Sequence, residues 1–357
     1  MSKNIVSLTK KLIAVKSTFE NKKSLEKALN FALKELKEFT IERFKQNSIP
    51  SVLVYKESKR PQKFKIILNG HLDIVPGKEY QYTARIKGNK LYGVGSMDMK
   101  ANVACLVKVF KDTADKVSYP LGLQLVTDEE IGGFDGTKHQ IDRGVRADFV
   151  IAGEPTNFDI AHKAKGILNM KISATGKTAH GAYPWRGDNA IWKMNEFLKI
   201  IKKKYSIPKK EKWVTTLNLS RIETTNKSFN KIPDDCEIWL DIRHVSKEGN
   251  TIIKEIKKIL PRGFKMEITS KEPALLTDRK NQYLRKLEKS IKDITGKKTI
   301  VRGANGSSDA RHFVPVNCPG VEFGPIGGDI GGDNEWVDIP SLEKYYQILK
   351  KFLLSVS

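Results

Sequence analysis

Continuous apolar runs that end in polar clusters recur along the first part of the chain. Residues 63–77 (KFKIILNGHLDIVPG) pass from a hydrophobic strand into a glycine-rich turn. Residues 121–133 (LGLQLVTDEEIGG) and 147–156 (ADFVIAGEPT) repeat this plan, and residues 101–116 between them have the spacing of a helix. Strands that alternate with helices predict an α/β sheet with a mostly parallel centre. The polar clusters then lie at strand ends, where open α/β sheets place their functional sites.

The pattern changes near residue 167, where ILNMKISATG alternates like a half-exposed strand. The elements that follow are predicted near residues 188–204, 214–223, 234–245, 248–260 and 264–270. Together they give the order β-α-β-β-α-β, which is ferredoxin-like. Helices are expected again at 278–296 and 341–355. We therefore expect residues 169–272 to form an inserted domain, and residues 1–168 and 273–357 to form one discontinuous sheet domain.

Composition and charge narrow the class of protein. The 357 residues carry a formal net charge of +23, but the lysines are dispersed along helical stretches and no nucleic-acid-binding motif accompanies them. We expect a solvated basic surface and no specific nucleic-acid partner. No apolar run approaches the roughly 20 residues of a membrane span, so no membrane association is expected. Three dispersed cysteines and the lack of a signal-peptide pattern predict a cytoplasmic protein.

Two of the polar clusters carry residues suited to metal chemistry. His71 and Asp73 are two positions apart on a strand, so they face the same side. A neutral imidazole binds zinc, and a neighbouring carboxylate can orient its ring. The alternative is a strand-end histidine beside a turn aspartate. Asp98 follows two glycines and precedes a helix, so it can bridge two cations or simply cap the helix.

Two further clusters add carboxylates. Residues 128–130 are three consecutive acids after a strand, and their mutual repulsion calls for a neutralising group. One of them suits a metal and another suits a general base, although a solvated acidic turn is the alternative. Glu154 ends another strand. One histidine and three or four carboxylates on one rim suit two divalent cations such as zinc, manganese or cobalt.

Together the motifs HxD, GxGxxDMK, DEExGG and GEPT, in this order, resemble those of the co-catalytic dinuclear zinc amidohydrolases and metallopeptidases. This family includes aminoacylase-1, acetylornithine deacetylase, succinyl-diaminopimelate desuccinylase and carboxypeptidase G. The resemblance runs over nearly the whole chain. It implies an α/β fold with a zinc-peptidase-like mixed sheet flanked by helices, and an inserted ferredoxin-like α+β domain that serves as lid and dimerisation domain.

The same resemblance assigns metal ligands. It implies that His71 and Glu154 hold one metal and Glu130 the other, with Asp98 as the bridge and Asp73 orienting His71. Two divalent ions are expected, zinc first, with cobalt or manganese as alternatives.

The implied reaction is hydrolysis of an amide bond in an N-acyl amino acid or a small peptide. Glu129 is the implied general base, which takes a proton from the metal-activated water and can hand it to the leaving amine. Glu154, as a glutamate, resembles the deacylase and carboxypeptidase branches more than the aminopeptidases.

Residues outside the metal motifs also match the family. GKTAHGAYPWRGDNAI (176–191) resembles the segment whose histidine, here His180, reaches into the partner's active site, which implies a homodimer through the inserted domain. Asn230 and Arg243 match substrate-binding positions. Ser308 and Arg311 lie in GSSDARHF, which resembles a segment that grips the substrate's carboxylate, a task that suits the planar guanidinium.

One position departs from the family pattern. The last ligand is expected to be a histidine three residues before an Asn-Glu pair, and that pair is present at 334–335. Gly331 stands where the histidine should be, and glycine cannot ligate a metal. Asp333, then Asp329, are the substitutes expected from the same loop, and His312 is a third. The alternatives are a weak or empty second metal site, or a catalytically impaired or inactive relative that binds acyl-amino acids or peptides.

Overall fold

The chain is divided into two units, each with its own hydrophobic core. The computed structural model describes residues 2–245 and 248–356. Unit 1 comprises Met1–Lys163, Leu275–Ala304 and Ser308–Ser357, and unit 2 comprises Ala164–Ala274 and Asn305–Ser307. The boundaries expected from the sequence lie at 168/169 and 272/273, and nothing in the sequence indicated that Asn305–Ser307 belongs to unit 2.

Unit 1 is built on a mixed sheet whose centre is parallel, as predicted. In the described residues its strand order is β1-β2-β6-β3-β7-β15-β8-β13, with β14 paired to β8. Neighbours β6, β3, β7 and β15 run parallel. Strand β2 pairs antiparallel with β1 and β6, and β8 pairs antiparallel with β15. The strands are β1 (Thr40–Gln46), β2 (Ile49–Tyr55), β3 (Phe64–His71), β6 (Leu121–Val126), β7 (Ala147–Ala152), β8 (Ile160–Ala164), β13 (Leu275–Leu276), β14 (Val301–Ala304) and β15 (Gly320–Glu322).

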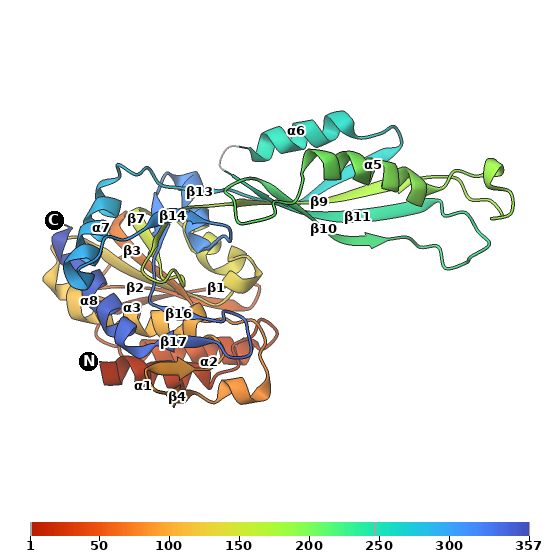
Figure 1. Ribbon diagram of the computed structural model, residues 1–357. Helices are drawn as coiled ribbons and strands as arrows, with labels where there is room; N and C mark the ends of the chain where they lie inside the picture. The colour runs from red at the N-terminus through yellow and green to blue at the C-terminus, as the bar shows by residue number, and fades with distance from the viewer. Residues whose placement is uncertain (1, 246–247, 357) are drawn as a thin grey trace. The chain divides into compact units, whose positions relative to one another are not determined.

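Helices pack on this sheet and against one another. Helix α3 contacts both α1 and α8, and α8 also contacts α7, as Figure 1 shows. Helix α3 is apolar around most of its circumference, which is typical of a helix buried between a sheet and other helices. The helices are α1 (Ser2–Ile13), α2 (Lys22–Leu33), α3 (Ala101–Thr113), α4 (His139–Asp142), α7 (Gln282–Thr295) and α8 (Ile339–Ser355).

A second, small sheet of unit 1 joins distant parts of the sequence. Its order is β16-β17-β5-β4, and all its strands have only two or three residues. They are β4 (Arg85–Lys87), β5 (Lys90–Tyr92), β16 (Gly327–Gly328) and β17 (Trp336–Asp338). Pairing of β17 with β5 places the loop 329–335 beside the turn that follows β5.

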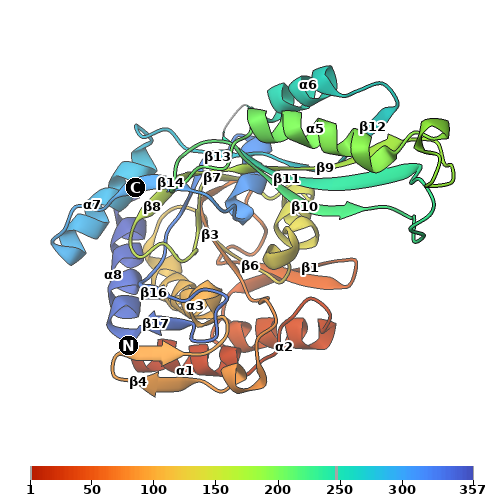
Figure 2. The same cartoon turned by 45° about the vertical axis from the view of Figure 1, so that its right-hand side comes forward.

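Unit 2 has the ferredoxin-like order that the sequence predicted. The strands among its described residues are antiparallel in the order β10-β11-β9-β12, and α5 and α6 lie on one face of this sheet (Figure 2). Alternate residues of β9 and β11 are buried, as expected for strands with one face against helices. The elements are β9 (Gly166–Thr175), α5 (Ala190–Lys204), β10 (Thr216–Glu223), β11 (Asp235–His244), α6 (Gly249–Ile259) and β12 (Phe264–Glu272).

Candidate active site

Three parallel strands of unit 1 bring the polar clusters to one edge of the sheet. The register aligns His71 of β3 with Val126 of β6, and Asn69 of β3 with Ala152 of β7. The residues that follow these strands therefore leave the sheet side by side. This arrangement confirms the expectation that the clusters lie at the ends of parallel strands, the usual place for a site in an open α/β sheet.

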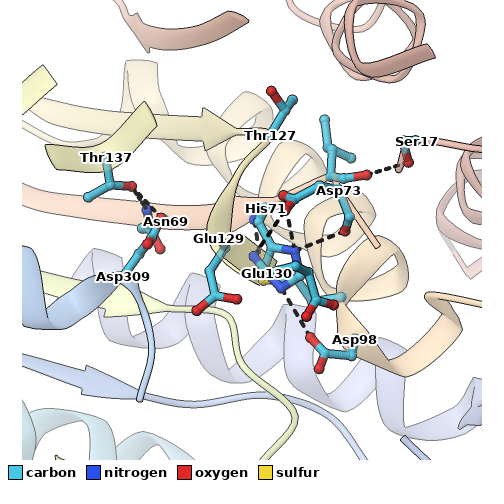
Figure 3. Close-up of polar contacts among 12 residues, drawn as sticks. Ser17, Asn69, His71, Asp73, Asp98, Thr127, Glu129, Glu130, Thr137 and Asp309 are labelled. Atoms are coloured by element: carbon cyan, nitrogen blue, oxygen red, sulfur yellow. Dashed lines mark hydrogen bonds and ion pairs between the residues drawn. The ribbon is translucent and has the colours of Figure 1, made fainter. Parts of the chain in front are cut away.

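His71 lies between two aspartates in the interior (Figure 3). Its Nε2 is 3.0 Å from Asp98 Oδ1, and its Nδ1 is 3.1 Å from the Asp73 carbonyl oxygen and 3.6 Å from Asp73 Oδ1. Burial alone would lower the pKa of His71, but hydrogen bonds to both aspartates outweigh it and raise that pKa well above the ordinary value. Asp73 Oδ2 accepts the Glu130 backbone N–H at 3.0 Å, and the part of Asp73 in orienting His71 stays a prediction.

His71, Asp98 and Glu154 form a group that could hold a metal ion. One ligand atom from each lies within 4.8 Å of the others. Glu154 Oε1 is buried and has no hydrogen-bond partner among the described residues. Burial, and then repulsion by Glu129, raise the pKa of Glu154 well above its usual range. One imidazole nitrogen, two carboxylates and an unsatisfied buried oxygen fit a divalent cation.

Glu129 stands beside this group and faces a buried arginine. The chain turns at η4 (Glu129–Ile131), directly after β6. Burial raises the pKa of Glu129 well above its usual range, although the charges of His71 and Arg311 oppose this rise. Arg311 Nη1 is 3.9 Å from Glu129 Oε1. A carboxyl group between a metal-ligand group and a guanidinium is placed to exchange protons with a reactant.

Glu130 faces a cavity of about 460 Å³ that it shares with Asp98. Burial raises the pKa of Glu130 to about 7, and the neighbouring aspartates Asp98 and Asp73 act in the same direction. Lys78 and the loop 330–333 line the same cavity. Ligation of a second metal by Glu130 and Asp98 stays a prediction, and both line the cavity beside the loop 329–335, which we call the glycine loop.

The glycine loop supplies no imidazole to this cavity. Gly331 has a φ of +67°, and a Cβ atom added there would meet no atom within 4 Å. Asp333 forms an ion pair with Lys78, and Asp329 accepts the Asn334 backbone N–H at 2.8 Å. Ligation by Asp333 or Asp329 stays a prediction, since both carboxylates have partners outside the metal-ligand group in this arrangement.

The residues predicted to grip a substrate carboxylate are buried. Arg311 has 2% of its side chain exposed, and its Nη2 donates to the Gly132 carbonyl at 2.6 Å. His312 Nε2 lies 2.8 Å from the same carbonyl, so it supports the turn after Glu129. Ser308 is also buried, at the start of η7 (Asp309–Val316). Substrate contact by Ser308 and Arg311 remains a prediction. Their proximity to the turn that carries Glu129 could not be read from sequence spacing.

The remaining predicted residues belong to unit 2. His180 lies in an exposed loop where it forms an isolated bridge with Lys231, and Gly181 N donates to the Asn230 carbonyl at 2.7 Å. His180 and Asn230 are therefore on adjacent segments, 50 residues apart in sequence. Arg243 is on β11 and pairs with Asp241 at 2.9 Å. The roles of these three residues stay predictions.

A search of the described residues for helices long and apolar enough to cross a membrane finds none.

Sequence comparison identifies relatives over most of the chain. The sequence model of peptidase family M20/M25/M40 matches residues 67–355. A succinyl-diaminopimelate desuccinylase of Pelagibacter ubique (strain HTCC1062) is 31% identical over 314 residues, which cover 79% of this chain and 81% of that protein. The corresponding protein of Sulfurimonas denitrificans (strain ATCC 33889 / DSM 1251) is 28% identical over 370 residues and covers 98% of each.

Structural comparison agrees on the fold. Aminopeptidase PepT from Bacillus cereus ATCC 10987 matches with a TM-score of 0.81 at 17% identity, covering 100% of this chain and 99% of that chain. The Bacillus subtilis YXEP protein, a dinuclear metal binding peptidase of the M20 family, matches with a TM-score of 0.74 at 13% identity, covering 99% and 97%. With the site and the family match taken together, the chain belongs to peptidase family M20/M25/M40 and is a metal-dependent hydrolase.

Proposed function

We propose that the protein hydrolyses an amide bond in an N-acyl amino acid or a small peptide, with Glu129 as the general base. The observation that carries this proposal is the convergence of His71, Asp98 and Glu154, with Glu129 beside them. The desuccinylase relatives favour an N-succinyl amino acid as the first substrate to test.

One divalent cation would be held by His71, Asp98 and Glu154, and zinc is our first candidate, with cobalt or manganese as alternatives. When bound, such a cation lowers the pKa of a water molecule and polarises the amide carbonyl. The second position fits less well, because Glu130 and Asp98 have no imidazole opposite them and Gly331 contributes no side chain. We propose that a second cation is held weakly there, and no catalytic step depends on it.

Proton transfer and the positioning of the catalytic groups are assigned to other side chains of unit 1. Glu129 accepts a proton from the attacking water and delivers it to the leaving amine. Asp73 fixes the orientation of His71 through the ring Nδ1. Arg311 and His312 both bind the Gly132 carbonyl, and they thereby hold the turn on which Glu129 sits.

A catalytically impaired relative that binds acyl-amino acids or peptides is a second candidate. It is favoured by one observation, the glycine at the position where the family pattern has a histidine. A weak second metal site would slow catalysis without preventing binding of substrate.

Metal content and a substrate panel distinguish these candidates. The protein is loaded with Zn²⁺, its metal content is measured, and hydrolysis of N-succinyl, N-acetyl and dipeptide substrates is followed, with Glu129→Gln as the control. We expect bound metal, turnover by the parent protein and loss of turnover in the control. If the parent protein binds metal without turnover, and Gly331→His also shows no turnover, the proposed hydrolysis is refuted and the binding role remains.

Assembly and compartment belong to the same proposal. We propose a homodimer formed through unit 2. In this dimer His180 donates a hydrogen bond to the oxyanion that forms when water attacks the amide carbonyl in the partner's site. The compartment is proposed to be the cytoplasm, since the three cysteines are free and a reducing environment keeps them so. Light scattering in solution tests the dimer, and a monomeric mass at micromolar concentration would contradict it.

A further inference from the structure

A buried glutamate of the glycine loop is bound to the turn that carries Asp98. Glu335 precedes β17 and is 3% exposed. Its Oε2 accepts the Gly95 N–H at 3.0 Å, and its Oε1 accepts the N–H groups of Met97 at 2.7 Å and Asp98 at 3.0 Å. One carboxylate therefore satisfies three backbone donors within four residues.

The shape of this turn explains why it needs an external acceptor. Gly95 has a φ of +72°, and Asp98 and Met99 have non-helical dihedral angles inside η2 (Ser96–Lys100). A backbone of this form cannot satisfy all its N–H groups by regular helical hydrogen bonds, and buried N–H groups are almost always paired. Ser96 and Lys100 donate to carbonyls of the same turn, whereas the donors of Gly95, Met97 and Asp98 point to Glu335.

Three hydrogen bonds fix the Glu335 side chain. Hydrogen bonds from N–H groups to a carboxylate are about twice as strong as those between neutral groups. Burial raises the pKa of Glu335, and the N–H groups of Asp98, Met97 and Gly95 oppose this rise. A buried lysine, Lys100, lies at the other end of the same turn, where its Nζ donates to the Val15 carbonyl at 2.8 Å. The Glu335 carboxyl group thus has a fixed place under the turn.

Asp98 depends on this turn for its position. Its Oδ1 is 3.0 Å from His71 Nε2, and it belongs to the metal-ligand group with Glu154. We propose that Glu335 is a positioning residue, which sets the backbone at Asp98 so that Asp98, His71 and Glu154 converge on one cation. In this role Glu335 acts through Asp98 and binds neither the metal nor the substrate. This inference rests on the proposed function, because it assigns Glu335 to the same metal site.

The hydrogen bonds of Glu335 predict how strongly each variant of this residue loses metal affinity. In Glu335→Gln the remaining Oε1 can still accept from Met97 and Asp98, but an NH₂ group faces the Gly95 N–H. Glu335→Ala leaves all three donors without the carboxylate. A change that removes a group supporting a metal ligand typically costs roughly 10–100-fold in metal affinity. We expect a loss in this range for Glu335→Ala and a smaller loss for Glu335→Gln.

Two measurements on the full chain test the proposal. Hydrogen exchange without metal, followed by mass spectrometry over residues 93–99, reports whether Glu335→Ala frees the turn. Titration with Co²⁺, followed by its visible absorption bands, reports affinity and ligand geometry. Ser341→Ala is the matched control, since it removes a buried hydroxyl that accepts from Ile326 N at 3.0 Å in the same region and touches no part of the turn.

We expect faster exchange at 93–99 and weaker Co²⁺ binding with an altered spectrum in Glu335→Ala, with Glu335→Gln between it and the parent. Ser341→Ala should keep the parent's affinity and spectrum even if its Tm falls. Unchanged exchange, unchanged Co²⁺ affinity, or an equal loss in Ser341→Ala would each overturn the proposal. Failure of the parent itself to bind Co²⁺ would instead refute the proposed function, and the exchange measurement alone would then decide whether Glu335 holds the turn.

Discussion

At the scale of single residues, hydrogen bonding distinguishes Glu335 from the acids proposed as metal ligands. Both oxygens of Glu335 accept backbone N–H groups. Glu154 Oε1 is buried without a partner among the described residues, and so is Asp73 Oδ1, although Asp73 Oδ2 accepts the N–H of Glu130. A buried carboxylate oxygen without a hydrogen bond gains from a nearby cation, and of these two acids only Glu154 belongs to the group with His71 and Asp98. Hydrogen bonding and position together separate acids that look equivalent in the sequence.

Glu129→Gln tests the general base. The amide keeps the size of the side chain but cannot accept a proton, so kcat should fall by about 10²–10⁴-fold. Glu129 is not one of the three residues in the metal-ligand group, so metal content should be unchanged. Steady-state kinetics together with elemental analysis check both expectations. A variant that retains the parent's kcat would remove Glu129 from the proton transfer.

Gly331→His tests whether a histidine at this position completes a second metal site. A Cβ atom at this position meets no atom within 4 Å, and the cost of a side chain in the left-handed backbone region is of order 1–3 kcal/mol. Histidine is among the residues enriched in that region. We expect the Co²⁺ stoichiometry to rise from one toward two, and kcat to rise with it. Gly331→Ala is the matched control, because it carries the same backbone cost without an imidazole and should bind one Co²⁺. Equal stoichiometry in the two variants would show that the imidazole does not reach the cavity.

At the scale of secondary-structure elements, bound metal should cross-link two hydrogen-bonded strands, β3 and β7, to the turn that precedes α3. His71 ends β3, Glu154 follows β7, and Asp98 lies in η2. A cation at about a hundredfold its Kd adds about 2.7 kcal/mol to the free energy of unfolding. A chelator should therefore lower the Tm of the parent protein, as measured by calorimetry. Glu154→Ala should show a much smaller change on chelation, and an equal change would place the stabilising metal elsewhere.

The elements differ in how far the sequence could predict them. Strands β3, β6 and β7 and helix α3 were predictable because each is a long apolar run with a clear end. The places of His71 and Glu154 at strand ends and of Asp98 before the helix follow from those runs, whereas their roles as ligands were implied by the family resemblance. Strands β4, β5, β16 and β17 have two or three residues, too few to show any periodicity. That small sheet brings Glu335 to the turn that carries Asp98. The contact between Glu335 and this turn therefore could not be predicted from the sequence. Burial of Arg311 against the Gly132 carbonyl was missed for the same reason, since it depends on packing between distant segments.

At the scale of the whole molecule, each unit has a separate core and carries its own set of candidate residues. The metal-ligand group and Glu129 belong to unit 1, and His180 and Asn230 lie on adjacent segments of unit 2. The order of unit 2's elements could be predicted in part because β9 and β11, its two central strands, alternate clearly in exposure. A contact with a partner subunit leaves no such periodic pattern, so the dimer rests on resemblance and needs an experiment of its own.

Mixing two inactive variants tests whether His180 acts across a dimer. Glu129→Gln lacks the base in its own site, and His180→Ala lacks the histidine that it would donate to its partner. In a mixed dimer, the subunit with His180→Ala keeps Glu129 and receives His180 from the other subunit, so one of its two sites is complete. Equal amounts that exchange subunits freely should recover about a quarter of the parent activity, since half the dimers are mixed and each has one complete site. Activity before and after brief unfolding and refolding of the mixture measures this recovery. Recovery absent from a mixture shown by mass spectrometry to contain mixed dimers would place the action of His180 within its own subunit or remove it from catalysis.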